Sequence, residues 1–143
     1  MAIASSLLKH KGHDIHSIAP EAPVLDAIRL MADLGIGALL VMQDGQLLGL
    51  VSERDYARKV ILKGRSSNDT AVRHIMSAPV LTVNAGQSVH DCMSIMTEHR
   101  IRHLPVVDGE RVIGVLSIGD LVRAVVEEQQ QTITDLEHYI QHP

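Results

Sequence analysis

The chain has 143 residues, of which 45% are hydrophobic, and a formal net charge of −4, which fits one compact domain or two very small ones. The acidic balance and the lack of Phe and Trp disfavour nucleic acid as the main partner. The single cysteine, Cys92, excludes an internal disulfide and indicates a reducing compartment. No apolar run approaches the roughly 20 residues of a membrane span, so we expect a cytoplasmic protein without a membrane partner.

In chain order, the first half predicts a lead-in strand at residues 15–18, a helix, two strands, and a second helix at residues 56–61. Two segments, 38–42 and 46–51, are predicted strands because the hairpin-turn signal Asp44-Gly45 lies between them. A loop rich in Gly, Ser and Asn follows at residues 63–70. The first helix is indicated by apolar residues spaced i, i+3, i+4 and i+7, namely Val24, Ala27, Ile28 and Met31.

The second half predicts the same elements again. A lead-in strand at residues 80–83 precedes a helix, and the strands 104–107 and 111–116 flank the turn signal Asp108-Gly109. The apolar face of the first helix is formed by Val89, Cys92, Met93 and Met96, and that of the second by Leu121, Val122, Val125 and Val126. The tail carries Ile133, Leu136 and Ile140 on one stripe, which predicts a helix that docks on another surface.

The two halves are copies of one unit. The stretch GLVSERD at residues 49–55 matches GVLSIGD at residues 114–120, and a shift of 65 residues aligns 24–60 with 89–125 without a gap. We therefore predict an internal duplication and an α+β fold built from two packed strand-helix-strand-strand-helix units. The identical pairs are Val24/Val89, Asp26/Asp91, Met31/Met96, Ile36/Ile101, Leu39/Leu104, Val41/Val106, Gly49/Gly114, Ser52/Ser117, Asp55/Asp120, Arg58/Arg123 and Val60/Val125.

The repeated Gly-x-x-Ser-x-x-Asp has two interpretations. A serine at a strand-to-helix junction, with an acid three residues later, is close to a helix capping box, which needs no ligand. The same helix N-terminus attracts phosphate, and an aspartate in its first turn can accept hydrogen bonds from a ribose diol. The two roles are compatible, because the serine can cap the helix while the aspartate faces a cleft.

Several stretches together resemble the cystathionine-β-synthase (CBS) domain. They are Met76-Ser77, residues 80–83, residues 89–96, Ile101-Arg-His-Leu-Pro-Val-Val-Asp-Gly109 and Gly114-Val-Leu-Ser-Ile-Gly-Asp-Leu121, with a diverged first copy upstream. The resemblance implies a tandem pair, or Bateman module, with pseudo-twofold symmetry. Its expected divisions are CBS repeat 1 at residues 12–66, CBS repeat 2 at residues 67–128 and a helical tail at residues 129–143.

The resemblance also implies two clefts between the repeats that bind adenosine ligands such as AMP, ADP, ATP, S-adenosylmethionine or NAD. In this pattern the aspartates Asp55 and Asp120 hold the ribose, with Ser52 and Ser117 beside them. The adenine would meet Ser17 and Ile18 in the first copy and Thr82 and Val83 in the second. Phosphate contacts are implied for Arg102 and His103, and a basic helix face suggests Arg54 as a further one. The first copy has Gly37 and Ala38 at the positions of Arg102 and His103, so the two clefts are expected to differ.

We therefore expect a regulatory module that senses an adenosine nucleotide and signals to an unknown protein partner, not an enzyme. The alternative is a structural or interaction module with empty clefts, and a third interpretation, an NAD-linked redox protein, lacks a placed catalytic acid, base or cysteine. No metal is expected, because the nine histidines form no closed ligand set. The helical stripes, too large for one short chain to cover, predict a homodimer through the helices of the pair.

Overall fold

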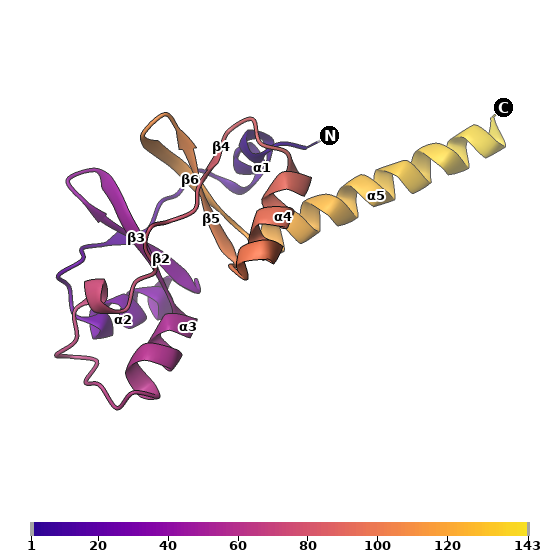
Figure 1. The fold of residues 1–143 in the computed structure, drawn as a ribbon. Coiled ribbons are helices and arrows are strands. Elements are labelled where there is room, and N and C mark those ends of the chain that lie inside the picture. Colours follow the sequence, from indigo (N-terminus) through magenta and orange to yellow (C-terminus); the bar gives the residue numbers. More distant parts are fainter. Residues whose placement is uncertain (1, 143) are drawn as a thin grey trace. The chain divides into compact units, whose positions relative to one another are not determined.

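The computed structural model describes residues 2–142, and they form two compact units (Figure 1). The first unit consists of residues Ile15–Leu81, and the second combines the described residues of Met1–Asp14 and Thr82–Pro143. Each unit has a three-stranded sheet and its own hydrophobic core. The predicted α+β class with two repeated units is therefore confirmed.

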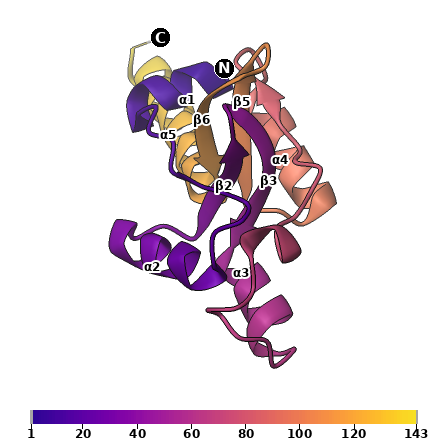
Figure 2. The same ribbon diagram turned by 90° about the vertical axis from the view of Figure 1, so that its left-hand side faces the viewer.

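The first unit contains the sheet β1-β2-β3 and its helices (Figure 2). β1 is parallel to β2, and β2 is antiparallel to β3. α3 continues without interruption into a π-helical turn, η1, and a short 3₁₀ turn, η2, follows the loop. The bounds are β1 (Ser17–Ile18), α2 (Val24–Leu34), β2 (Ala38–Gln43), β3 (Gln46–Ser52), α3 (Glu53–Tyr56), η1 (Ala57–Ile61) and η2 (Val72–His74).

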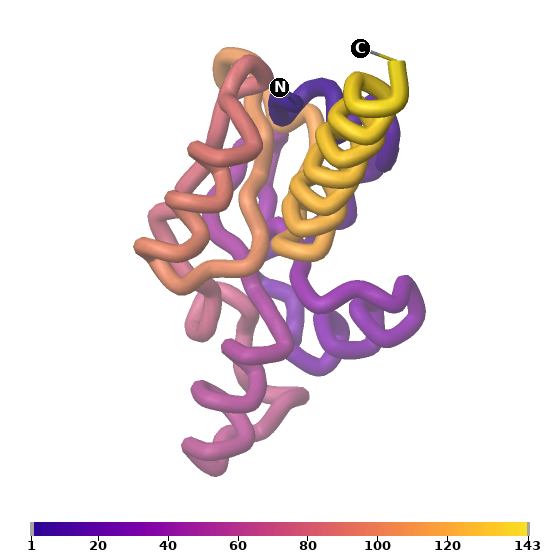
Figure 3. Tube along the Cα trace, turned by 90° about the vertical axis from the view of Figure 1, so that its right-hand side faces the viewer, coloured from indigo at the N-terminus to yellow at the C-terminus, as the bar shows by residue number. Residues whose placement is uncertain are grey.

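The second unit repeats this arrangement in the sheet β4-β5-β6, with β4 parallel to β5 and β5 antiparallel to β6. Two differences set it apart: an N-terminal helix, α1, packs on β6 and α5, and α5 is much longer than its counterpart (Figure 3). The bounds are α1 (Ala4–Lys11), β4 (Val83–Asn84), α4 (Val89–His99), β5 (His103–Asp108), β6 (Arg111–Ser117) and α5 (Ile118–Gln141).

Each unit is completed by the segment that precedes the other repeat in the chain. In the first unit, a Cβ on Gly49 of β3 would lie 2.6 Å from Sδ of Met76, which follows η2. In the second unit, a Cβ on Gly114 of β6 would lie 2.6 Å from Cδ2 of Leu8 in α1. At both paired glycines a covering side chain approaches the strand more closely than an added Cβ would allow without a shift. α1 itself was not predicted as an element of the second unit.

The two hairpins use different turns. In the first, Asp44 and Gly45 both have positive φ, at 52° and 77°, as a type I′ turn requires. In the second, Asp108 still pairs with Arg111, so the two loop residues are Gly109 and Glu110. The Asp-Gly signal predicted Asp108 and Gly109 as the turn residues, whereas in the structure Gly109 occupies the first turn position and Asp108 still belongs to the strand.

The apolar stripes expected to form an exposed patch are divided by the structure. Val89, Cys92 and Met96 of α4 are at most 2% exposed, and they pack in the core of the second unit with Leu121 of α5. Only Val122 and Val126 of the named residues are exposed large hydrophobics. The exposed stripe predicted for the dimer is therefore corrected: most of it is already covered within its own unit, in a core to which α1 also contributes.

α5 runs for 24 residues, and its second half projects away from the sheet of its own unit (Figure 1). Residues 129–142 are all exposed. The last residue of the expected tail, Pro143, lies outside the described residues. Within residues 2–142, no helix is both long and apolar enough to cross a membrane.

Candidate functional site

The repeated Gly-x-x-Ser-x-x-Asp lies where a sheet ends and a helix begins in each unit. Ser52 caps α3, and its hydroxyl accepts a hydrogen bond from the amide of Asp55 at 3.1 Å, while Oδ2 of Asp55 accepts one from the Ser52 amide at 2.9 Å. Ser117 and Asp120 form the same pair of bonds at 3.2 Å and 2.8 Å. Both capping boxes of the structural interpretation are therefore present.

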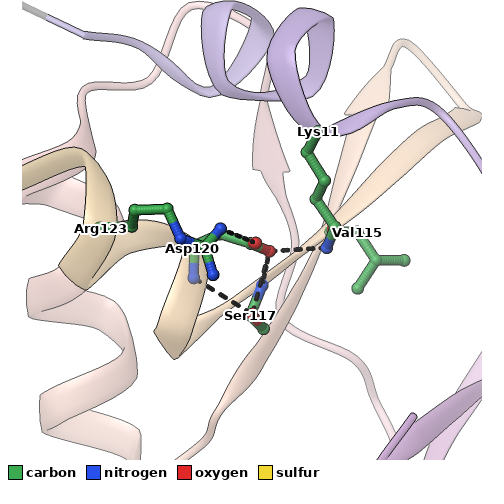
Figure 4. A network of polar contacts seen from close by, with 5 residues as sticks. All are labelled: Lys11, Val115, Ser117, Asp120 and Arg123. Atoms are coloured by element: carbon green, nitrogen blue, oxygen red, sulfur yellow. Dashed lines mark hydrogen bonds and ion pairs between the residues drawn. The ribbon is translucent and has the colours of Figure 1, made fainter. Parts of the chain in front are cut away.

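Asp120 is surrounded by cations (Figure 4). Nζ of Lys11 donates hydrogen bonds to Oδ2 of Asp120 at 2.6 Å and to the carbonyl of Val115 at 2.7 Å. Nη1 of Arg123 lies 3.5 Å from the other carboxylate oxygen, and the Asp120 side chain is only 11% exposed. Burial alone would raise the pKa of Asp120, but the hydrogen bonds from Lys11 and Ser117 outweigh it and hold this pKa below its ordinary value.

Asp55 has an equivalent environment in the first unit. Its Oδ1 lies 3.1 Å from Nζ of Lys59 and 3.5 Å from the hydroxyl of Ser77. Lys59 also donates to the carbonyl of Ile75 at 2.9 Å, which holds the ammonium in place. Asp55 is buried, with a side chain that is 12% exposed, so each unit keeps one shielded carboxylate beside one lysine.

The two lysines come from different parts of the sequence. Lys59 is four residues after Asp55, a spacing that places both side chains on one face of a helix. The corresponding position in the second unit is Ala124, and the lysine is supplied by α1 instead. Neither lysine was among the predicted site residues. Lys59 could have been found from its spacing, but no pattern in the sequence connects Lys11 with Asp120.

The predicted phosphate residues Arg102 and His103 lie beside the Ser117–Asp120 cap. The carbonyl of Arg102 accepts a hydrogen bond from the Ile118 amide at 2.9 Å, and His103 is opposite Ser117 in the sheet. Burial, followed by the charges of Lys11 and Arg102, lowers the pKa of His103, against an opposing effect of Asp120. In the first unit the equivalent backbone contact is from the Glu53 amide to the carbonyl of Gly37 at 3.1 Å, with no cationic side chain at that position.

The predicted adenine residues lie on the lead-in strands. Ser17 is exposed and Ile18 half-buried on β1, and Thr82 is exposed next to β4. The Val83 side chain is 2% exposed in the core, so a ligand would meet its backbone. Arg54 is exposed in the first turn of α3. In each unit the serine and the aspartate lie together where the helix after the third strand begins. The lead-in strand pairs with the opposite edge of the central strand from the strand that ends in this serine.

An open pocket of about 600 Å³ lies beside Asp120 in the second unit. Lys11, Asp120 and Arg123 line part of it, and Glu127 and Glu128 of α5 contribute acidic groups. Among residues 2–142, no group of three or more His, Cys, Asp or Glu side chains is arranged to hold a metal ion. The chemistry available at each helix start is therefore hydrogen bonding and charge pairing by one carboxylate and its neighbouring cations.

Two α+β units, each with one capped aspartate at the same helix start, define a duplicated regulatory-type module. The family model for the CBS domain matches residues 10–62 and 72–127, so the chain belongs to the CBS-domain family and carries two such domains. The chain is 40% identical over 146 residues to the mitochondrial CBS domain-containing protein CBSX3 of Arabidopsis thaliana, covering 96% of this chain and 71% of the relative.

Solved structures agree with this assignment. A CBS-domain protein from Burkholderia ambifaria superimposes with a TM-score of 0.86 at 50% identity, over 90% of this chain and 96% of that one. The fold also matches the CBS domain pair of protein MJ0100, with a TM-score of 0.80 at 20% identity over 90% of this chain and 98% of that one. That protein was solved in complex with 5′-methylthioadenosine and S-adenosyl-L-methionine.

Proposed function

We propose that the protein is a regulatory module that binds an adenosine nucleotide, with Asp55 and Asp120 accepting hydrogen bonds from the ribose. The observation that carries the proposal is the recurrence of a shielded carboxylate, 11–12% exposed, next to a lysine at the start of a helix in both units. A capping box needs only the serine and the acid. It does not require a cation held against the same carboxylate, so the charge pair supports a further role.

The ligand class follows from the groups at each site. A carboxylate accepts from a diol, while an ammonium and an exposed helix N-terminus favour phosphate oxygens. AMP, ADP, ATP and NAD combine both features in one molecule. The adenosine ligands bound by the MJ0100 pair support the nucleoside part of this proposal, since they demonstrate what a pair of this fold holds in that protein.

The test is direct binding. Protein purified without an affinity tag is analysed for released small molecules by mass spectrometry, and calorimetry and melting are then measured with AMP, ADP, ATP, NAD, S-adenosylmethionine and adenosine. A ligand present at a hundred times its dissociation constant should stabilise the fold by about 2.7 kcal/mol. An unchanged melting temperature with all six compounds would overturn nucleotide binding and leave the interaction module with empty clefts.

We further propose that the chain forms a homodimer. Val122 and Val126 on α5 are 46% and 56% exposed, and the exposed apolar residues continue along the rest of that helix. Contiguous apolar surface of this kind is typical of interfaces, and identical chains usually associate with twofold symmetry. Light scattering tests this, because a mass of 15.6 kDa at micromolar concentration would contradict the dimer.

A further inference from the structure

α5 has two apolar faces. Leu121 is fully buried in its own unit, with Ala124 and Val125 packed against the same core. A second set lies about a quarter turn around the helix, at 100° per residue, and remains exposed. We call this second set the seam, and it consists of Val122, Val126, Ile133, Leu136 and Ile140, which are 46%, 56%, 49%, 56% and 74% exposed.

The seam follows a heptad repeat. Its residues, with Gln129 at the one polar position, are separated alternately by four and three residues, which is the a/d spacing of a coiled coil. β-branched residues occupy the a positions Val126, Ile133 and Ile140, and leucine occupies the d position Leu136. Such a seam can pack, knobs into holes, against the same seam of a second helix, and the number of helices, two, follows from the proposed homodimer.

The far half of α5 also lacks support from its own chain. Residues 129–142 are all exposed, so no side chain there packs on a core. Isolated helices shorter than about 12–15 residues are marginal in water, and Thr132, Ile133 and Thr134 have low helix propensity. A partner that covers the seam would supply the packing that this segment needs.

We propose that the α5 helices of two chains form an antiparallel two-stranded coiled coil along the seam. This inference rests on the proposed homodimer and specifies where its contact lies. In the antiparallel register, the core pairs are Val126 with Leu136 of the partner subunit, Ile133 with Gln129 of the partner subunit, and Ile140 with Val122 of the partner subunit.

Charged residues beside the seam favour the antiparallel arrangement. In the antiparallel register, Arg123 faces Glu137 of the partner subunit at both ends of the coiled coil, and Gln130 faces its own copy. In a parallel register, Glu137 would face Thr132 of the partner subunit, and no opposite charges would meet. Because two ion pairs form in one arrangement and none in the other, flanking charges select the antiparallel one.

The direction is tested by disulfide cross-linking. A chain with Val126→Cys is mixed with a chain carrying Leu136→Cys, and the covalent dimer is measured on a non-reducing gel. The native Cys92 does not compete, because it is fully buried and burial, then the charge of Asp91, raises the pKa of its thiol. We expect a cross-link only in the mixture. Cross-linking of Val126→Cys alone would overturn the antiparallel register in favour of a parallel one.

The apolar character of the seam is tested by aspartate substitutions. The double variant Ile133→Asp with Leu136→Asp should weaken the dimer on the order of a hundredfold, as seen by analytical ultracentrifugation, because two carboxylates would enter the apolar interface. Both residues are about half exposed in one chain, so circular dichroism should keep the spectrum of a folded protein. The matched control, Thr134→Asp with His138→Asp, adds the same charge on the opposite face and should leave the dimer intact.

The outcomes separate the two proposals. A dimer that survives the seam substitutions overturns the coiled coil and keeps the homodimer. A wild-type chain that is monomeric overturns both, and nucleotide binding is measured independently. Glu137→Arg should weaken the dimer several-fold through repulsion from Arg123, and Arg123→Glu in the same chain should restore it. Failure of this restoration would contradict the antiparallel ion pairs.

Discussion

Asp120 both completes the cap of α5 and, in the proposed function, holds a ribose. We expect Asp120→Ala, and Asp55→Ala in the first unit, each to weaken nucleotide binding at one site by roughly ten- to a hundredfold, because hydrogen bonds to a charged acceptor contribute about 1.5–3 kcal/mol. Each variant should also lose about 1 kcal/mol of stability with its cap. Calorimetry and urea unfolding on the same samples measure the two effects.

Ser117→Ala is the matched control for the cap. It removes the hydroxyl that accepts from the Asp120 amide but keeps the carboxylate. This variant should therefore lose similar stability and bind nucleotide nearly as well as the wild type. If Asp120→Ala instead binds like Ser117→Ala, the aspartate acts only as a helix cap, and its role in ribose binding is wrong.

The lowered pKa of His103 should make the stability of the protein depend on pH in the acidic range. Its pKa is lowered by burial and by the charges of Lys11 and Arg102. Between the lowered folded pKa and the unfolded value of about 6.5, the unfolded chain binds a proton that the folded chain does not, so stability falls as pH drops through this range. We expect His103→Gln to reduce the stability lost between pH 7.5 and pH 5.5 in urea unfolding. An identical loss in the variant and the wild type would contradict this.

The sequence was sufficient to predict some residues of the candidate site and insufficient for others. The repeat contains the same serine and aspartate twice at the same spacing, so the sequence could identify Ser52, Asp55, Ser117 and Asp120. The sequence could not identify Lys11 as a neighbour of Asp120, because the two residues are more than a hundred residues apart in the chain. The repeat gives no help, since the position of Lys59 in the first copy is Ala124 in the second. Tertiary contacts between distant segments leave no periodicity to detect.

At the scale of elements, α1 packs closely on β6 where Leu8 covers Gly114. Gly114→Ala would place a Cβ within 2.6 Å of Leu8, whose side chain is fully buried. We expect Gly114→Ala to destabilise the protein by about 1–3 kcal/mol through overpacking, and Leu8→Ala to cost about 2–5 kcal/mol through the cavity it leaves. Urea unfolding of both variants measures these losses.

The double variant distinguishes this contact from independent effects. Since Leu8→Ala removes the atoms that a new Cβ would meet, the double variant should be less destabilised than the sum of the two single ones by about 0.5 kcal/mol or more. Strict additivity would mean that Gly114 is required for another reason. Gly49→Ala, which meets Met76 in the first unit, provides the parallel test.

The sequence predicted most helices and strands, but it did not predict which unit each terminal segment packs in. The helices 24–34 and 89–99 and both hairpins follow from apolar spacing and turn residues. α1 was not predicted, because its eight residues have only two buried positions, Ala4 and Leu8, too few for a clear period. α1 packs on β6 and α5, which lie far away in the chain, and no local pattern encodes that contact.

For the whole molecule, the unequal surroundings of the two aspartates predict two classes of ligand site. The second unit has Arg102, His103 and a lysine from α1, whereas the first has Gly37, Ala38 and Lys59. One additional charged hydrogen bond is worth about 1.5–3 kcal/mol, so we expect AMP to bind the two sites with affinities that differ by roughly tenfold or more. Adenosine, which lacks phosphate, should discriminate less.

Calorimetry of three proteins measures this difference. The wild type should give two binding steps with AMP, Asp55→Ala should retain the tighter step, and Asp120→Ala should retain the weaker one. Arg102→Ala should narrow the gap for AMP but not for adenosine. Two equal steps in the wild type would contradict a phosphate-reading role for Arg102 and His103.

The placement of α1 also affects how the chain is made. α1 leaves the ribosome well before its packing partners, because β6 and α5 follow the whole first unit in the chain. Residues 15–81 include every strand and helix of the first unit, so that unit can fold during synthesis. Ala4 and Leu8 meanwhile have no core to enter and remain exposed on the nascent chain until residues 82–142 emerge. α1 is thus made before its partners but folds with them, so Lys11 reaches Asp120 only after α5 has been synthesised.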